Sequence, residues 1–122
     1  MKFQIVLLCL FFLVELNATP FYFKSYDMED GLSNNHVTCC VQDDYGFMWF
    51  GTRDGLNRFD SKKFYTFKSY SSEKGSLMSS YILDLAKSPT GQIWVSTNLG
   101  LQKYDYQTDS FTLIDFTKGI NC

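Results

Sequence analysis

The stretch GFMWFGT at residues 46–52 returns 45 positions later as GQIWVST at residues 91–97. The match continues on the same register, from GLNRFD at residues 55–60 to GLQKYD at residues 100–105. Six identities result: Gly46, Trp49, Thr52, Gly55, Leu56 and Asp60 recur as Gly91, Trp94, Thr97, Gly100, Leu101 and Asp105. Half of these pairs are Gly or Trp, which seldom coincide by chance, so the chain is built from an internal repeat.

Each repeat divides into four short apolar runs separated by turn residues. The runs span residues 37–42, 47–52, 56–60 and 64–68 in the first repeat, and residues 81–87, 92–97, 101–105 and 111–116 in the second. Four strands joined by tight turns within about 45 residues are typical of one β-propeller blade. The sequence therefore predicts an all-β, partial propeller of two four-stranded antiparallel blades.

The repeated residues are predicted to have structural roles. The four repeated glycines fall at turns that favour positive φ. Trp49 and Trp94 are expected to fill the space between blades, with stacking on a sugar as the alternative. Thr52 and Thr97 are expected to support the turns that follow them.

Composition excludes several classes of protein. The chain has 122 residues and a net charge of −2, without the basic surplus typical of nucleic-acid binders. Aromatic residues make up 18%, which favours packed β-structure over disorder. We predict no metal site and no cofactor, because the chain has no CxxC pair and only one histidine, His36.

Residues 1–18 are predicted to form a cleaved signal peptide. Lys2 precedes an apolar run at residues 3–14, and the small Ala18 precedes the expected cut. The run is too short for a membrane span, so we expect an exported chain without a membrane anchor. Loss of Cys9 with the leader would leave Cys39, Cys40 and Cys122, which form no obvious disulfide framework.

The first repeat resembles a known family. GLSNNHV at residues 31–37, QD at residues 42–43 and GFMWFGTRDGLNRFD at residues 46–60 are similar to the two-component regulator propeller repeat. The second repeat departs from the pattern, with Ser96 in place of glycine and Pro89 in place of aspartate. The resemblance implies the periplasmic sensor region of a hybrid two-component histidine kinase, whose kinase, receiver and DNA-binding modules this sequence lacks.

The resemblance also implies a division of the chain. Residues 19–30 are expected to hold the outer strand of an incomplete blade, near Phe21 to Tyr26. Residues 31–74 would form the first blade, and residues 75–122 the second blade with the start of the next linker. We expect a truncated piece of a sensor, whose partners are the remaining blades.

Three functions remain open at this stage. The first is a fragment of a propeller that senses a ligand, with an oligosaccharide implied by the family and ligand-binding residues unknown. The second is a stand-alone secreted module that oligomerises, and the third is a fragment of a propeller lyase or sialidase. We predict no catalytic residue, because Asp43, Asp44 and Asp54 fit turns and no nucleophile motif is present.

Overall fold

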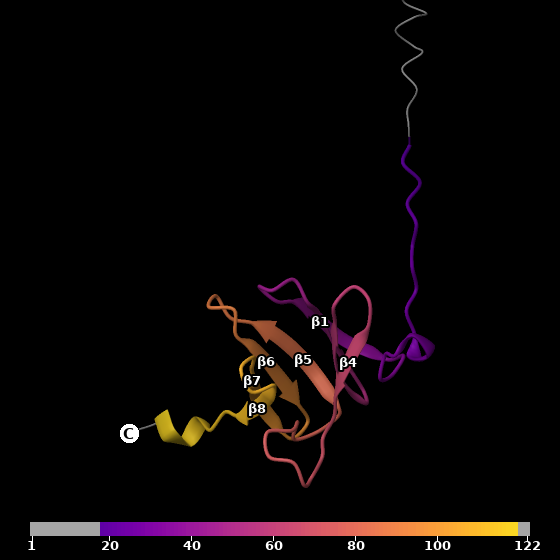
Figure 1. The fold of residues 1–122 in the computed structure, drawn as a ribbon. Coiled ribbons are helices and arrows are strands. Elements are labelled where there is room, and N and C mark those ends of the chain that lie inside the picture. Colours follow the sequence, from indigo (N-terminus) through magenta and orange to yellow (C-terminus); the bar gives the residue numbers. More distant parts are fainter. Residues whose placement is uncertain (1–17, 120–122) are drawn as a thin grey trace, which may run out of the picture.

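The computed structural model describes residues 18–119, which form two four-stranded antiparallel sheets (Figure 1). The sheets have the strand orders β1-β2-β3-β4 and β5-β6-β7-β8. The strands are β1 (Val37–Gln42), β2 (Met48–Thr52), β3 (Gly55–Phe59), β4 (Phe64–Phe67), β5 (Ile82–Lys87), β6 (Ile93–Thr97), β7 (Gly100–Asp105) and β8 (Ser110–Leu113). The prediction of an all-β fold with two four-stranded sheets is confirmed.

Each sheet is a meander of consecutive strands, and the tightest turn has the same design in both. Thr52 pairs with Gly55, and its Oγ1 donates a hydrogen bond of 2.9 Å to the Gly55 carbonyl. Thr97 and Gly100 repeat this arrangement at 3.2 Å. Gly55 has a φ of 133°, in a region that side-chain-bearing residues rarely adopt. The threonine hydroxyl and the glycine backbone together hold the β2–β3 and β6–β7 turns.

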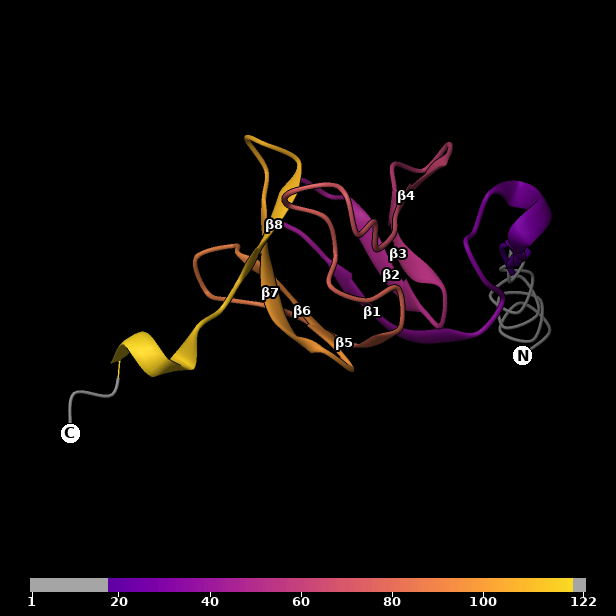
Figure 2. The ribbon, with the colours of Figure 1, turned by 90° about the horizontal axis from the view of Figure 1, so that it is seen from below.

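The two sheets are arranged like neighbouring blades. Their first strands, β1 and β5, lie close together, whereas β4 and β8 are spread apart (Figure 2). Between the sheets, the hydroxyl of Thr38 donates a 2.8 Å hydrogen bond to the carbonyl of Ile82. Convergence at the first strands gives the pair a wedge shape, as in a propeller.

The core is the contact between one face of each sheet. Because side chains alternate along a strand, Trp49 and Gly51 point to one side of the first sheet, while Met48 and Phe50 point to the other. We call the side that carries Trp49 and Gly51 the forward face, and the opposite side the rear face. The forward face of the first sheet packs on the rear face of the second, where Ile93, Val95 and Tyr104 are fully buried.

The other two faces lie on the outside of the pair. The rear face of the first sheet carries Met48, Phe50 and Phe59, and the forward face of the second carries Trp94 and Ser96. Trp94 is accordingly only half-buried, whereas Trp49 is completely buried. Trp49 therefore lies in the core between the two sheets, while no described residue completes the same packing around Trp94.

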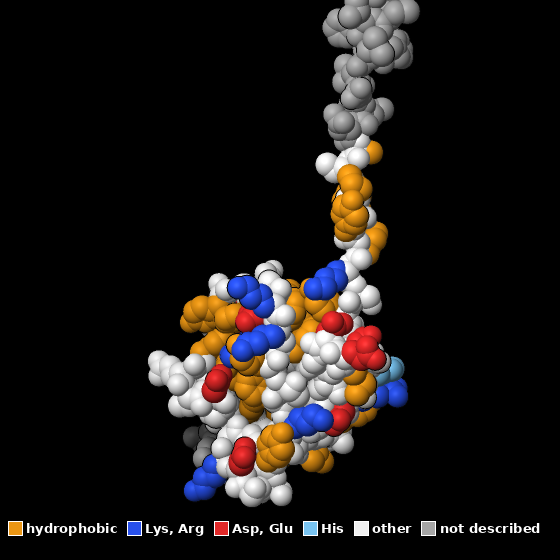
Figure 3. Space-filling model, turned by 45° about the vertical axis from the view of Figure 1, so that its right-hand side comes forward, with side chains coloured by type: hydrophobic (Ala, Val, Ile, Leu, Met, Phe, Trp, Pro, Cys, Tyr) orange, Lys and Arg blue, Asp and Glu red, His pale blue; other side chains and the backbone are white. Residues whose placement is uncertain are grey.

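The expected outer strand near Phe21 to Tyr26 is wrong for this structure, in which residues 18–27 form no strand. Phe21, Tyr22 and Phe23 are 87%, 90% and 97% exposed. Figure 3 shows hydrophobic side chains along the N-terminal segment, clear of the body of the molecule. A strand requires a partner with free backbone groups, and no described sheet edge pairs with this segment.

Two further differences concern the ends of the chain. The last strand ends at Leu113 rather than Phe116, and the 3-10 helix η2 (Phe116–Gly119) follows. A second 3-10 helix, η1 (Met28–Asp30), precedes the first sheet. Most of the expected signal peptide, Cys9 and Cys122 lie outside the described residues.

Candidate ligand-binding cleft

Asp43 joins the two sheets at the turn between β1 and β2. Its side chain is buried, with 4% exposed, and its Oδ1 accepts hydrogen bonds from the backbone N–H groups of Tyr45 and Phe47, at 3.0 and 2.9 Å. Its Oδ2 accepts hydrogen bonds from Nε1 of Trp49, at 2.8 Å, and from the hydroxyl of Tyr106, at 2.9 Å. The carboxylate thus fixes its own turn, the core tryptophan and a residue of the second sheet at once.

Tyr106 follows β7 and contacts the same cluster. Its ring lies 4.9 Å from that of Tyr45 and 4.8 Å from that of Tyr104, centroid to centroid. Burial, followed by the hydrogen bond and the negative charge of Asp43, raises the pKa of the Tyr106 hydroxyl well above its usual range. Tyr106 is therefore neutral at physiological pH and acts as a hydrogen-bond donor to Asp43.

Arg58 supplies the positive charge of this region. Its side chain is only 16% exposed, and its guanidinium lies 5.2 to 5.7 Å from the ring centres of Phe47, Trp49, Tyr65 and Phe67. It donates a 2.8 Å hydrogen bond to the hydroxyl of Tyr104 and forms an ion pair of 3.3 Å with Asp109. Aromatic faces attract a cation, and Asp109 balances its charge.

These residues surround an open cleft of about 430 Å³ between the two sheets. The first sheet contributes Tyr45, Phe47 and Arg58, and the second contributes Tyr106, Gln107 and Asp109. Tyr45 is 71% exposed, so much of its surface is free to contact another molecule. A free aromatic ring beside an amide and a balanced ion pair can bind a ligand that has both apolar faces and hydroxyl groups.

The residues predicted from the repeat lie mainly away from this cleft. Trp49 lies beneath it, whereas Thr52, Gly55, Thr97 and Gly100 lie at the β2–β3 and β6–β7 turns. Asp60 accepts hydrogen bonds from the backbone N–H groups of two lysines, and Asp105 accepts one from Gln107. Gly46 and Gly91 have φ values of 90° and 85° in their turns, and Leu56 is buried while Leu101 is half-buried.

Sequence reasoning did not identify the cleft residues, although one signal pointed to them. Phe59 pairs with Phe64 across five positions, whereas Tyr104 pairs with Phe111 across seven. The β7–β8 hairpin is therefore two residues longer than its counterpart, because Asp105 and Ser110 form an additional pair, and its loop holds Tyr106, Gln107 and Asp109. An insertion that breaks a regular repeat is where a binding function is expected.

The structure does not gather metal-ligating side chains within residues 18–119. Cys39 is half-buried and Cys40 is exposed, and both are free thiols. Burial, the larger effect, outweighs the hydrogen bonds from Thr38 and the Gly51 backbone and raises the pKa of the Cys39 thiol.

Comparison with known proteins identifies the repeat. Residues 31–54 match the family model described as the two component regulator propeller. This segment is similar to a two component regulator propeller repeat. It covers the approach to β1, β1 itself, the turn held by Asp43, and β2 with Trp49.

The chain is also similar to larger sensor proteins. Histidine kinase P4 of Formosa agariphila is 46% identical over 67 residues, which are 53% of this chain and 5% of that protein. A solved extracellular domain from B. thetaiotaomicron, assigned to the hybrid two component system BT3049, matches with a TM-score of 0.71 and 36% identity. The match covers 80% of this chain and 14% of that one, so the chain spans a small part of its relatives.

A further solved structure supports the fold alone. The extracellular domain assigned to the hybrid two component system BT4673 of B. thetaiotaomicron has a TM-score of 0.61 at 23% identity, over 77% of this chain and 14% of that one. Together the matches show that the chain resembles the extracellular propeller domain of hybrid two-component sensors. Residues 18–119 contain no helix of the length and apolarity that a membrane span requires.

Proposed function

We propose that this chain is part of a ligand-sensing propeller of a hybrid two-component sensor and that its cleft binds an uncharged oligosaccharide. The resemblance to extracellular sensor domains supports the sensing role and a location outside the cytoplasm. The exposed ring of Tyr45, beside the Arg58–Asp109 ion pair, is the observation that carries the choice of ligand.

The chemistry of the cleft suits a sugar. One side of a pyranose ring presents C–H groups, which can lie against the free face of Tyr45, while its hydroxyls can pair with Gln107 and Asp109. Because Asp109 already balances Arg58, the cleft has no uncompensated charge to attract an acidic sugar. Arg58 is held by four rings, so it offers its donors in a fixed position.

The binding test uses neutral oligosaccharides of glucose, mannose, xylose and galactose, titrated into the purified chain by calorimetry. At least one should bind, and Tyr45→Ala should weaken that binding at least about tenfold, because a stacked ring contributes a kcal/mol or more. Tyr70→Ala is the matched control: Tyr70 is also exposed, at 52%, but lies outside the cleft, so its loss should leave affinity unchanged. Absence of binding by every sugar, or equal affinity of the Tyr45→Ala variant, contradicts the proposal.

Export is the second part of the proposal and has its own test. A fusion of the full chain to alkaline phosphatase, which is active only after export, should show activity in a bacterial host. Deletion of residues 3–14, the apolar run, should abolish that activity. A fusion that stays inactive, or one that remains active after the deletion, argues against a signal peptide at residues 1–18.

A further inference from the structure

A second, smaller hollow adjoins the cleft at Tyr45. It has a volume of about 170 Å³ and is lined by Asp44, Tyr45, Thr90, Gly91, Gln92 and Tyr106. We call it the Gln92 hollow. It shares Tyr45 and Tyr106 with the cleft, whose other lining residues are different. The two hollows therefore meet at this pair of tyrosine rings.

The walls of the Gln92 hollow are two turns that lie against each other. Asp44 belongs to the turn between β1 and β2, and Gly91 belongs to the turn between β5 and β6. Nζ of Lys87 lies 2.6 Å from Oδ1 of Asp44, and a Cβ added at Gly91 would collide with Oδ2 of the same carboxylate. An ion pair and a close backbone approach thus hold the walls together, so the hollow is already formed without a ligand.

The Gln92 hollow offers hydrogen-bonding groups without an unbalanced charge. Nε2 of Gln92 donates a hydrogen bond to the carbonyl of Tyr104, which fixes the amide and leaves its Oε1 able to accept from a ligand. Thr90 is exposed, and its hydroxyl lies 2.9 Å from that of Ser88, with lone pairs left for a further partner. Lys87 balances the charge of Asp44. Hydroxyl groups of a neutral ligand suit such a lining.

The ring of Tyr45 connects the two hollows. Its centroid lies 4.9 Å from that of Tyr106, at an interplanar angle of 52°. Asp43 fixes both residues, because it accepts hydrogen bonds from the backbone N–H of Tyr45 and from the hydroxyl of Tyr106. A ligand that extends from one hollow to the other must therefore cross a ring that is held in place.

The Gln92 hollow is too small to be a separate site. Independent sites for small molecules begin at about 300 Å³, which the cleft exceeds and the Gln92 hollow does not reach. Both hollows are bordered by residues of the two sheets at the place where these sheets already pack on each other. The smaller one is thus an extension of the cleft, with room for a further part of the same ligand.

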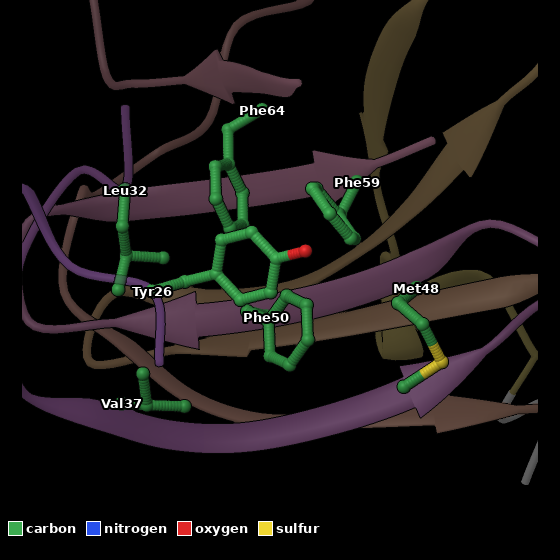
Figure 4. A pocket seen from close by; sticks show the side chains of 7 residues that line it. All are labelled: Tyr26, Leu32, Val37, Met48, Phe50, Phe59 and Phe64. Carbon is green, nitrogen blue, oxygen red and sulfur yellow. The ribbon is translucent and has the colours of Figure 1, made fainter. Parts of the chain in front are cut away.

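The apolar hollow on the rear face of the first sheet is of a different kind (Figure 4). It has a volume of about 320 Å³, and its lining includes Met48, Phe50 and Phe59. Ile93 and Val95 occupy the positions of Met48 and Phe50 in the second sheet, where the first sheet buries them. Such a face packs on a neighbouring blade in a propeller, so it is no candidate for a ligand.

We propose that the cleft and the Gln92 hollow are two subsites for consecutive units of one linear, uncharged oligosaccharide. One unit occupies the cleft, the chain crosses the ring of Tyr45, and the next unit pairs its hydroxyls with Gln92 and Thr90. This inference rests on the proposed function and deepens it, because it sets a minimum length of two units for full affinity.

The test compares chain lengths in the purified full chain. The monosaccharides glucose, mannose, xylose and galactose and their linear disaccharides are titrated by calorimetry. For the sugar that binds best, the disaccharide should bind at least about tenfold more tightly than the monosaccharide, because the second unit gains hydrogen bonds that the first cannot make. This ratio is a property of the wild-type chain and depends on no variant.

A blocking substitution places the second unit in the Gln92 hollow. Thr90→Trp should fill the hollow, leave monosaccharide affinity unchanged and lower disaccharide affinity about tenfold, so that the two affinities become nearly equal. Ser72→Trp is the matched control, since Ser72 is exposed in a turn and lines neither the cleft nor the Gln92 hollow. Circular dichroism of both variants should match that of the wild type.

The outcomes separate this inference from the function on which it rests. Equal affinity of the wild type for the monosaccharide and the disaccharide overturns the second subsite and leaves a cleft that binds one unit. A Thr90→Trp variant that keeps the full ratio, or one that weakens both sugars alike, also overturns it. Absence of binding by every sugar overturns the proposed function and the second subsite together.

Discussion

At the scale of single residues, the repeated tryptophans are chemically identical but occupy different environments. Trp49 is completely buried and donates a hydrogen bond to Asp43, whereas Trp94 is half-buried on an outer face. Equal residues at equivalent strand positions therefore contribute differently to stability, because only one has a neighbouring sheet to pack against.

We expect Trp49→Ala to lower the free energy of unfolding by about 3–5 kcal/mol, the usual loss for a large buried ring. Trp94→Ala, the matched control, should lose less than half as much. Urea titration followed by far-UV circular dichroism measures both. Equal losses for the two variants would show that the inter-sheet contact does not dominate stability.

Tyr106 contributes a part of the unfolding free energy that is lost at alkaline pH. Its pKa is raised in the fold above the ordinary tyrosine value of 10.0, so the folded state keeps a proton that the unfolded state releases at alkaline pH. Stability from this group is complete below pH 10 and is lost as the pH rises above that value. The wild-type advantage in unfolding free energy over Tyr106→Phe should therefore shrink in alkaline buffer, and a constant difference would argue against the hydrogen bond to Asp43.

At the scale of strands, one glycine sets how closely the sheets approach. A Cβ at Gly51 would lie 2.5 Å from Sγ of Cys39 and 2.6 Å from Cγ2 of Ile82. These distances are shorter than van der Waals contact, so β2 cannot carry a side chain here while β5 stays in place.

Gly51→Ala should therefore lower the free energy of unfolding by about 1–3 kcal/mol through overpacking. Ser96→Ala, at the equivalent position of the second sheet, should change it by less than about 0.5 kcal/mol. In a double-mutant cycle, Ile82→Ala should cost less in the Gly51→Ala background than alone, because the methyl group fills the space that it vacates. Strictly additive losses would mean that the two residues do not press on each other.

The strands were largely predictable from the sequence, because local signals determine them. Short apolar runs separated by turn residues placed all eight strands, with ends that differ by up to a few residues. Phe23 to Tyr26 repeats the sequence of Phe67 to Tyr70, of which only Phe67 belongs to a strand. The N-terminal copy forms no strand, because pairing depends on a partner that local sequence does not encode. For the same reason, the sequence did not distinguish the environments of Trp49 and Trp94.

The cleft could not be predicted, because its residues come together only through packing. Asp43 has the sequence features of a turn residue and does form a turn, but its contacts with Trp49 and Tyr106 depend on how the sheets pack. Arg58 is one of few arginines in the chain, and its four aromatic neighbours lie on three different strands or turns.

At the scale of the whole molecule, the shared core lies between the sheets rather than within each of them. Backbone amides of β2, β6 and β7 border this core, whereas β4 and β8 form sheet edges. Residues 18–26 join neither sheet of the described chain. The free energy of local opening should therefore be highest in β2, β6 and β7, lower in β4 and β8, and lowest in the N-terminal segment.

Hydrogen–deuterium exchange should accordingly be slowest in β2, β6 and β7, faster in β4 and β8, and immediate in residues 18–25. Peptide-resolved mass spectrometry over increasing exchange times measures this gradient. Protection of residues 18–25 comparable to that of β4 would show that the N-terminal segment is paired with another strand in solution, and uniform protection of all eight strands would contradict a core confined to the interface.

The contact of Tyr26 with Phe59 and Phe64 also bears on the order in which the chain is made. A ribosome or a secretion pore delivers the N-terminal end first, so Tyr26 is available before the sheet that it covers has been completed. As soon as β3 and β4 emerge, Tyr26 can pack on the apolar face that carries Phe59 and Phe64. The Tyr26 ring thus shields part of this apolar face from other chains during the interval in which unfinished β-sheets are most prone to aggregate.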